Sequence, residues 1–512
     1  MAIRFREKIW FNVFLLIFLL PVITLKYFPT TDGPSHLYNA SLIKQLLFNN
    51  NISSLFFHFN TYPQLNWSGH VLLTLLQCLL PAWLAEKLLL ITYVSSLAFS
   101  FRLLVLQINN NVGFGTFLIF PFLYTFIFYL GFYNFLLSLP LIFFICWYWN
   151  RNVADLSAHK FIVMAILFLV IYFSHLLSFA IAVLCVCTMV LFHYKKNEWM
   201  KQIVLFICSV LPCLLLASIF FFNNKLTGFN GTIDYLPIKE LIGFLTDARP
   251  LICYTQLESE WTQIVFFVFL VLIITQMVMR LKLHLKNKLS YNFFKAYDVW
   301  FLLAMFSIIL LFAIPDNIAS GGFVSIRLSL FVFLFFAIWL AVAESVSIIK
   351  NVAILIVVFV TIKLSYDRFQ STNCLCNEVK IIEQASKFIN NNSVVLPLNY
   401  STRWTTINTL NYVGCIKQVV VLDNYEAGHK TFPLLWNTKV DPSIYLGEQG
   451  KNNHPCVSIL EYEKRIQHKV DYVITFQRDI AMNDSCTLST LSQLNTLYRK
   501  IFEDETRLVE VY

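Results

Sequence analysis

The sequence predicts an α-helical polytopic membrane protein with a C-terminal α/β domain, and three observations carry this prediction. Of the 512 residues, 58% are hydrophobic and only 13% are charged, whereas soluble domains carry about 25% charged residues. Apolar segments of membrane-spanning length recur along residues 1–365. From residue 366 to residue 512, charged and polar side chains return and the apolar runs shorten to strand length.

Residues 1–365 are predicted to cross the membrane repeatedly. A helix needs roughly twenty consecutive apolar residues to span the hydrocarbon core of a bilayer. The twelve candidate segments are 9–25, 67–83, 87–106, 114–130, 131–149, 160–175, 176–194, 202–222, 261–279, 299–314, 328–347 and 351–365.

The distribution of basic residues sets the expected number of crossings. The basic N-terminus and the basic loop 280–298 should both face the cytoplasm, because cytoplasmic loops carry an excess of Lys and Arg. Both do so if residues 160–194 form one passage that is broken near Ser174-His175. We therefore predict about eleven transmembrane helices. A composition rich in Phe, Asn, Lys and Ile indicates an AT-rich bacterial genome, so the expected location is a bacterial cytoplasmic membrane.

Residues 366–512 are predicted to fold as an extracytoplasmic α/β domain. Short apolar runs predict buried strands, and apolar stripes at helical spacing predict amphipathic helices between them. The region has about 145 residues, which is long enough for a hydrophobic core of its own. Its cysteines permit one or two disulfides in an oxidising compartment. The predicted strands are 393–398, 418–422 and 470–476, the helices are 377–389 and 458–467, and the cysteines are Cys374, Cys376, Cys415, Cys456 and Cys486.

The stretch from Asp32 to Tyr38, just after the first apolar segment, combines a carboxylate, an imidazole and a phenol. Gly33-Pro34 is a turn signal, and apolar residues at helical spacing predict a short helix over 37–48. Asp32 then lies beside the N-terminus of this helix, where the helix dipole favours a negative charge. His36 lies about one turn further on, facing the same way. A simple helix cap followed by an interfacial helix is the alternative reading.

Ionisable residues inside apolar segments are costly and are commonly functional. His70 lies inside such a segment, and His175 lies at the break of another. For both histidines the alternative is a ring that is satisfied by backbone carbonyls. Arg102 is expected to snorkel or to form a local ion pair. Glu86 and Lys87 are expected to form an adjacent pair of opposite charges at the membrane interface, where water or lipid headgroups satisfy them.

On this topology the first outward loop is 26–66, which contains the Asp32 stretch, and polar residues also gather in two further outward loops, 223–260 and 315–327. Arg327 follows a Gly-Gly turn in loop 315–327, and a guanidinium there can bind two oxygens of an anionic phosphate at once. A lipid-headgroup anchor is the alternative reading of this arginine. The polar residues of loop 223–260 include Asp247, Arg249, Tyr254 and Glu258.

Four motifs stand out in the membrane part: Asp32-Gly33-Pro34-Ser35-His36-Leu37-Tyr38, Leu84-Ala85-Glu86-Lys87, Gly131-Phe132-Tyr133-Asn134-Phe135, and Gly321-Gly322 followed by Arg327. Together with an Asp in the first outward loop, a multi-helix body and an α/β tail, they resemble the C-type glycosyltransferase superfamily (GT-C). The resemblance covers residues 1–365. Within the superfamily, the chain resembles a bacterial branch of predicted membrane glycosyltransferases. Better-known members often carry an Asp-Glu pair where this chain has Asp-Gly-Pro-Ser-His.

The resemblance implies transfer of a sugar from a polyprenyl-phosphate donor to an acceptor at the outer face of the membrane. Asp32 is then the base that deprotonates the acceptor hydroxyl, and His36 orients Asp32 or binds the acceptor. Arg327 and Arg249 are the candidates to hold the departing phosphate. Whether the reaction needs a divalent cation, Mg²⁺ or Mn²⁺, is left open. Asp32 is the candidate ligand for such an ion. The residues assigned to the substrate cavity are Tyr38, His70, His175, Asp247, Tyr254 and Glu258.

Two other functions fit the same sequence: a transporter or flippase of a lipid-linked saccharide, and a non-enzymatic membrane assembly protein. Many transporters show internal repeats and helices interrupted by Gly or Pro in corresponding halves, but this sequence shows no repeat and few such helices. An assembly protein leaves the polar cluster at 31–38 unexplained. The expected partners are membrane lipids and a glycan, lipid or protein acceptor. The net charge of +9 fits cytoplasmic loops and indicates no nucleic acid.

Overall fold

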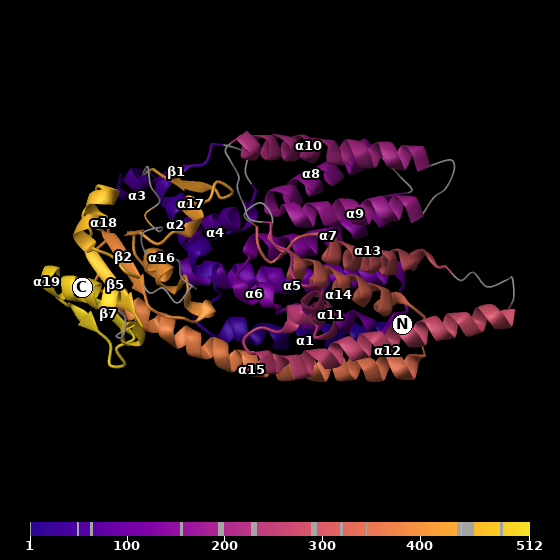
Figure 1. Cartoon of the computed structure of the whole chain (residues 1–512). Coiled ribbons are helices and arrows are strands. Elements are labelled where there is room, and N and C mark those ends of the chain that lie inside the picture. Colours follow the sequence, from indigo (N-terminus) through magenta and orange to yellow (C-terminus); the bar gives the residue numbers. More distant parts are fainter. Residues whose placement is uncertain are drawn as a thin grey trace. The chain divides into compact units, whose positions relative to one another are not determined.

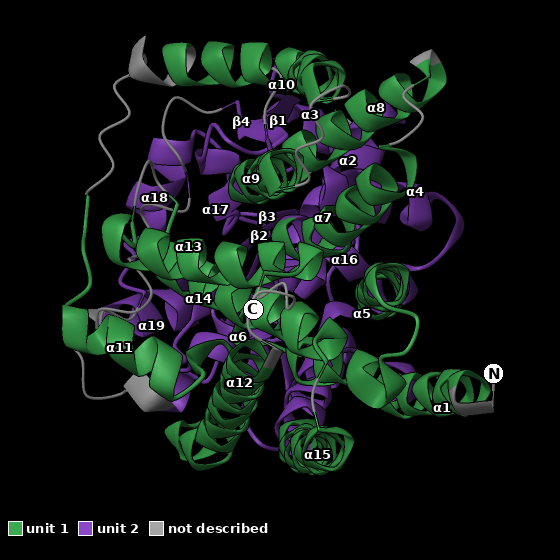
Figure 2. Ribbon diagram, turned by 90° about the vertical axis from the view of Figure 1, so that its right-hand side faces the viewer, with its two compact units in different colours: residues 1–20, 92–128, 135–369 green, residues 21–91, 129–134, 370–512 purple. Residues whose placement is uncertain are grey.

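The computed structural model describes residues 2–48, 51–61, 65–153, 157–192, 199–226, 233–287, 294–317, 321–344, 346–437, 442, 455–481 and 485–512. They group into two compact units, which Figure 2 colours separately. The expected division was a single boundary at 365/366, whereas unit 2 combines the C-terminal region with two segments from the first 134 residues. Unit 1 comprises Met1–Leu20, Thr92–Phe128 and Phe135–Phe369, and unit 2 comprises Pro21–Ile91, Tyr129–Asn134 and Gln370–Tyr512.

The chain is a helical polytopic protein. Within the described residues, eight helices are long and apolar enough to cross a membrane, and three shorter apolar helices accompany them. The helices of the membrane part are α1 (Ala2–Thr24), α4 (Ser68–Leu79), α5 (Ala82–Ile108), η1 (Gly113–Phe122), α6 (Phe126–Leu130), α7 (Tyr133–Asn152), α8 (Ala158–Ser174), α9 (Leu176–Phe192), α10 (Trp199–Leu226), α11 (Ile238–Thr246), α12 (Ser259–Asn287), α13 (Val299–Ala313), α14 (Val324–Val342) and α15 (Ser347–Ser386) (Figure 1).

Proline marks two places where a predicted span and the structure differ. The predicted span 67–83 is only the 12-residue helix α4. It ends because Leu80, which precedes Pro81, is extended, the conformation that a following proline favours. The predicted span 114–130 starts as the 3-10 helix η1, which contains Pro121, and continues as the short helix α6.

Two other predictions for the membrane part are confirmed. The chain is broken at His175, which is extended between the end of α8 and the start of α9. Arg102 forms a local ion pair: its Nε lies 2.9 Å and its Nη2 2.6 Å from the two carboxylate oxygens of Glu7. An arginine inside an apolar segment is therefore neutralised by a partner within unit 1.

A single 40-residue helix, α15, covers the predicted span 351–365 and most of the predicted helix 377–389 (Figure 1). The stretch contains neither Gly nor Pro, so no residue type that ends helices occurs at the expected boundary. The boundary between the two units, at 369/370, falls inside this helix.

Unit 2 contains a mixed five-stranded sheet with the strand order β3-β2-β5-β7-β6. β2 pairs in parallel with β3 and β5, and β7 pairs antiparallel with β5 and β6. The three predicted strands are confirmed as the three parallel strands, and the predicted helix 458–467 is confirmed as α18. The elements are β2 (Val394–Asn399), β3 (Val420–Val421), β5 (Tyr472–Phe476), β6 (Phe502–Glu503), β7 (Val509–Val511), α18 (Ile459–Ile466) and α19 (Ser485–Leu497).

The segment after α1 folds together with the C-terminal region inside unit 2. The short strand β1 (Phe57–Phe59) pairs antiparallel with β4 (Leu434–Trp436). The helix α2 (Gly33–Leu47) is largely buried and packs against four short elements as well as the α3 helix (Asn51–Phe56). These four are α4, η7 (Thr409–Asn411), α16 (Tyr412–Ile416) and α17 (Tyr425–Gly428).

The cysteines of the C-terminal region differ in state. Cys456 is disulfide-bonded, which agrees with the prediction of a disulfide in this region. Cys374, Cys376 and Cys415 are free thiols.

Candidate functional site

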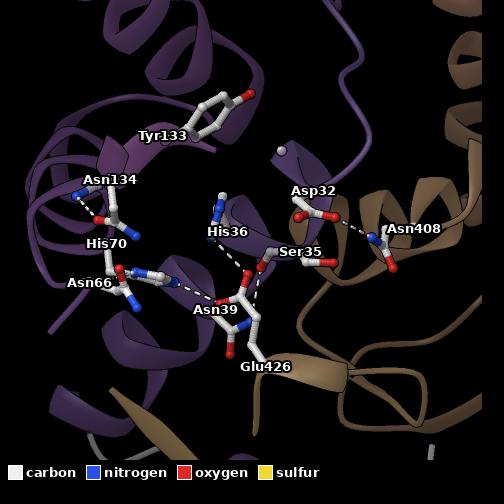
Figure 3. A network of polar contacts seen from close by, with 12 residues as sticks. Asp32, Ser35, His36, Asn39, Asn66, His70, Tyr133, Asn134, Asn408 and Glu426 are labelled. Carbon is white, nitrogen blue, oxygen red and sulfur yellow. Dashed lines mark hydrogen bonds and ion pairs between the residues drawn. The ribbon is translucent and has the colours of Figure 1, made fainter. Parts of the chain in front are cut away.

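Asp32 directly precedes α2, and its backbone is fixed by a neighbouring segment. Its amide donates a hydrogen bond to the Leu130 carbonyl at 2.9 Å, and the Thr31 amide donates to the Tyr129 carbonyl at 3.0 Å. The Asp32 side chain makes no capping hydrogen bond to α2. Its Oδ1 accepts a hydrogen bond from Asn408 Nδ2 at 2.9 Å instead (Figure 3). Because the helix does not use this carboxylate, the simple capping interpretation fails.

The close approach of the two backbone segments requires a glycine at position 131. Gly131 has a φ of +79°, a region that side chains with a Cβ rarely adopt. A Cβ there would lie 2.6 Å from the Gly33 amide nitrogen and 2.4 Å from Thr30 Oγ1. The glycine of the 131–135 motif therefore lets this segment hold the backbone of Asp32.

His36, His70 and Glu426 form a buried cluster, with one residue each from α2, α4 and α17 (Figure 3). His36 Nδ1 lies 2.7 Å from one carboxylate oxygen of Glu426, and His70 Nε2 lies 2.8 Å from the other. The two imidazoles are nearly perpendicular, at 87°, with ring centroids 5.1 Å apart. The carboxylate thus lies between two imidazoles, which is a set of side chains that could hold a metal ion.

Asparagine side chains fix the helices that carry this cluster. Asn39 of α2 and Asn424, the residue before α17, exchange two hydrogen bonds of 3.0 Å each. Asn424 also caps α17 through its side chain. Asn134 Oδ1 accepts a hydrogen bond of 2.7 Å from the Gly69 amide at the start of α4. These contacts hold α17 and α4 in place and so position two of the three cluster residues.

A second buried carboxylate, Glu86, lies in the same unit. The Tyr133 hydroxyl donates to its Oε1 at 2.8 Å, and the Tyr412 hydroxyl donates to its Oε2 at 3.1 Å. The expectation of a solvated Glu86–Lys87 pair is wrong, because Glu86 is buried and Lys87 donates to the Ile23 carbonyl at 3.0 Å. Glu86 therefore joins the motif at 84–87 to the motif at 131–135.

The buried setting changes the protonation of the polar groups. Burial raises the pKa of Asp32 to about 6, against the opposing effect of His36. Burial disfavours the charged form of His36, but the Glu426 carboxylate outweighs it and raises the pKa of His36 above its usual range. Burial would also raise the pKa of Glu426, but the facing imidazoles lower it to about 2. Asp32 is thus a stronger base than an ordinary aspartate and is still largely ionised at neutral pH.

Accessibility separates Asp32 from the cluster. His36, His70 and Glu426 are buried, whereas Asp32 is only partly buried. A general base must come within hydrogen-bonding reach of the proton that it takes. Among these four side chains, Asp32 is therefore the one suited to contact a substrate directly.

Tyr38, assigned from the sequence to a substrate cavity, is fully buried. Its hydroxyl accepts a hydrogen bond of 2.8 Å from the Val421 amide in β3. Its ring lies so close to Gly414 that a Cβ at position 414 would come within 2.3 Å of it. In this structure Tyr38 packs α2 onto the sheet and α16.

Two predicted residues, Arg327 and His175, meet on one aromatic ring of unit 1. The guanidinium carbon of Arg327 lies 5.4 Å from the centroid of the Phe135 ring. The His175 ring stands nearly perpendicular to the same ring, with centroids 5.0 Å apart. Arg327 lies one turn into α14, which Phe323 precedes in a left-handed conformation.

Arg249, the second predicted phosphate ligand, also lies on an aromatic ring in unit 1. Its guanidinium carbon is 4.4 Å from the centroid of the Phe126 ring, and its Nη1 donates to the Ile252 carbonyl at 2.7 Å. The 3-10 helix η2 (Arg249–Leu251) packs against α14, the helix that carries Arg327. The two arginines therefore belong to adjoining elements.

The remaining predicted residues, Asp247, Tyr254 and Glu258, make local contacts in unit 1. Asp247 Oδ1 accepts a hydrogen bond from Gln263 Nε2 at 2.9 Å. Glu258 Oε1 accepts one from the Tyr254 amide at 2.8 Å, and its Oε2 accepts two from Arg368 at 2.8 and 2.9 Å. Glu258 is thus one half of a buried ion pair.

Sequence reasoning missed Glu426 and Asn408 and underestimated Glu86. Glu426 lies five residues beyond the end of β3, in the stretch Asp423-Asn424-Tyr425-Glu426. Ligand-binding residues of α/β sheets commonly lie just beyond the carboxyl ends of parallel strands. A polar run in that position is the signal that could have identified Glu426.

The fold and the polar contacts define a helical polytopic membrane protein with a buried acid–imidazole cluster. No model of a known protein family matches the chain, and no curated protein matches it.

Proposed function

We propose that this protein is a membrane glycosyltransferase that uses a polyprenyl-phosphate-linked sugar as its donor. The observation that carries the proposal is the placement of Asp32, a residue that is only partly buried, whose side chain does not cap α2 and which lies close to a buried His–Glu–His cluster (Figure 3). Contacts among three of the four motifs support it: Gly131 packs on the backbone of Asp32, and Tyr133 binds Glu86.

In this proposal Asp32 takes the proton from the acceptor hydroxyl. The acceptor oxygen then forms a bond to the anomeric carbon of the sugar. The bond between that carbon and the phosphate oxygen breaks, and polyprenyl phosphate leaves with the electron pair. Asn408 keeps the carboxylate oriented through its hydrogen bond. His36, held by Glu426, acts on Asp32 electrostatically, and not by contact with the donor.

Arg327 and Arg249 are proposed to bind the phosphate of the donor. Each guanidinium lies on a phenylalanine ring, which limits the conformations open to it, so less entropy is lost when it binds an oxyanion. A guanidinium can bind two phosphate oxygens at once, whereas a lysine ammonium offers one point charge.

Replacing Arg327 with alanine should weaken use of the donor. Loss of one hydrogen bond to a charged group costs about 1.5–3 kcal/mol, or roughly ten- to a hundredfold. Arg327→Lys should weaken use of the donor less, because lysine keeps the positive charge but cannot bind two phosphate oxygens at once. The measurement is transfer rate with donor and acceptor titrated separately. If only the acceptor dependence changes in Arg327→Ala, Arg327 belongs to the acceptor site and this assignment is wrong.

The proposed location is a bacterial cytoplasmic membrane, with about eleven crossings and residues 366–512 outside the cytoplasm. The disulfide at Cys456 supports an oxidising compartment for this region. A topology reporter fused at Tyr512 should be active only outside the cytoplasm. Activity confined to the cytoplasm would exclude this topology.

The transferase proposal is tested with the purified full chain in proteoliposomes that contain polyprenyl-phosphate sugars of several kinds. Wild-type protein should release polyprenyl phosphate from one of these donors when an acceptor fraction from the cell envelope is added. If a donor instead moves intact to the opposite leaflet, with no polyprenyl phosphate released, the protein is a flippase and the proposal fails.

A further inference from the structure

The cluster of His36, His70 and Glu426 offers two nitrogen atoms and a carboxylate to one point inside unit 2. All three residues are at most 3% exposed. Their potential ligand atoms lie within 4.8 Å of one another. The three residues come from α2, α4 and α17, so the arrangement depends on the tertiary fold and not on a local sequence repeat.

The second nitrogen of His70 fixes where its proton lies. His70 Nδ1 is 3.0 Å from the Asn66 carbonyl oxygen. A carbonyl oxygen only accepts hydrogen bonds, so Nδ1 carries a proton and donates it. In the neutral ring Nε2 then holds a lone pair, and this lone pair points at a Glu426 oxygen 2.8 Å away. Either a second proton or a cation must lie at that point. A carbonyl that accepts from the far nitrogen is also the usual support of a metal-binding histidine.

The other half of the cluster lacks a well-aligned hydrogen bond. His36 Nδ1 and Glu426 Oε1 are 2.7 Å apart. In the part of the chain that the structure describes, the two atoms form an ion pair with each other, but its angles are poor for a hydrogen bond and neither atom has another hydrogen-bond partner. A buried polar contact with poor alignment is weaker than a well-aligned hydrogen bond. A cation bound to both atoms would satisfy them together.

We propose that His36 Nδ1, His70 Nε2 and a carboxylate oxygen of Glu426 bind one divalent transition-metal ion of the zinc type. Zinc binds imidazole nitrogen at about 2.0–2.1 Å and carboxylate oxygen at about 2.0–2.2 Å, which places tetrahedral ligands roughly 3.3 Å apart. The present contacts are 2.7 and 2.8 Å, so modest side-chain adjustments accommodate the ion. Two imidazoles favour zinc over the Mg²⁺ or Mn²⁺ that the sequence left open at Asp32, because those ions prefer oxygen ligands.

Three protein ligands leave a fourth position of the ion open. Zinc sites with three protein ligands bind water or a substrate atom at that position, whereas structural sites are closed by four. Asp32 belongs to no potential ligand group among the described residues, so the ion site is separate from the proposed base. The inference does not rest on the transferase proposal, because bound metal is measured without any substrate.

The test is metal content of the purified full chain. After incubation with zinc sulfate and gel filtration, wild-type protein should retain one zinc ion per chain by elemental analysis, and X-ray absorption should show two imidazole ligands. His70→Gln and His36→Asn each place an amide nitrogen near the former ring nitrogen. These amide nitrogens can still donate a hydrogen bond to Glu426, so both variants should fold. Their affinity for zinc should fall at least about tenfold.

Matched control variants separate this site from adventitious binding. His58 is an exposed histidine of β1 that pairs with Asn437, and Glu86 is a buried carboxylate held by two tyrosines. His58→Gln and Glu86→Gln should retain one zinc ion. The inference is overturned if folded wild-type protein binds no zinc, which would identify the cluster as a buried ion pair. It is overturned equally if His70→Gln and His36→Asn bind zinc as the wild type does.

Discussion

Replacing Asp32 with asparagine should lower the rate of sugar transfer by about 10²–10⁴-fold, the usual contribution of a general base. An amide cannot take the proton of the acceptor hydroxyl at neutral pH. The variant should still fold, because the amide has nearly the same shape and its oxygen can accept the hydrogen bond from Asn408. The backbone contact to Leu130 does not involve the side chain and also remains.

The measurement compares release of polyprenyl phosphate by wild-type and Asp32→Asn proteins that elute identically in gel filtration. Asp479→Asn is the matched control, because Asp479 is an exposed carboxylate of the same unit, with 56% of its side chain accessible. That variant should keep the wild-type rate. Wild-type turnover in Asp32→Asn would exclude Asp32 as the base and leave the function of the cluster to be sought elsewhere.

The site residues that the sequence predicted are those whose proximity follows from their spacing along the chain. Asp32 and His36 are four residues apart at the start of one helix, so their proximity follows from helical geometry. His70 was recognisable as a costly histidine in an apolar segment. Glu426 lies 356 residues from His70, and no local pattern specifies a contact over that separation.

Glu86 shows how adjacency in sequence misleads. Its neighbour Lys87 suggested a solvated pair, yet the two side chains point to different partners: Glu86 to two tyrosines and Lys87 to a backbone carbonyl. On a helix, residues one position apart do not face each other. The partners at 133 and 412 are brought in by tertiary folding alone.

The fold was predictable where long apolar runs or strong turn signals decided the structure. The strands at 394–399 and 472–476 are mostly apolar, and both were predicted. The two-stranded β1–β4 pair joins residues 57–59 to 434–436. These are three-residue strands, too short for periodicity to reveal, so the folding of the first outward loop with the tail could not be predicted.

Glu258, predicted as a substrate-cavity residue, should instead prove essential for stability. Glu258→Gln should destabilise the protein by about 3–5 kcal/mol, the usual cost of removing one partner of a buried ion pair. Arg368 is 3% exposed, and the variant removes the carboxylate charge to which its guanidinium donates two hydrogen bonds. Its contacts to the Tyr124 and Leu251 carbonyls provide dipoles and not a negative charge.

Thermal unfolding of the purified protein in detergent measures this effect. Glu260→Gln is the matched control, since Glu260 is an exposed carboxylate at the start of α12, two residues from Glu258, and it should lose no more than a few tenths of a kcal/mol. The double variant Glu258→Leu/Arg368→Met should recover part of the loss, because paired apolar replacements remove the uncompensated charge. The recovery should be incomplete, because Glu258 also accepts hydrogen bonds from the Cys253 and Tyr254 amides. An unfolding temperature in Glu258→Gln equal to that of the wild type, together with lost transfer, would instead place Glu258 in a substrate site.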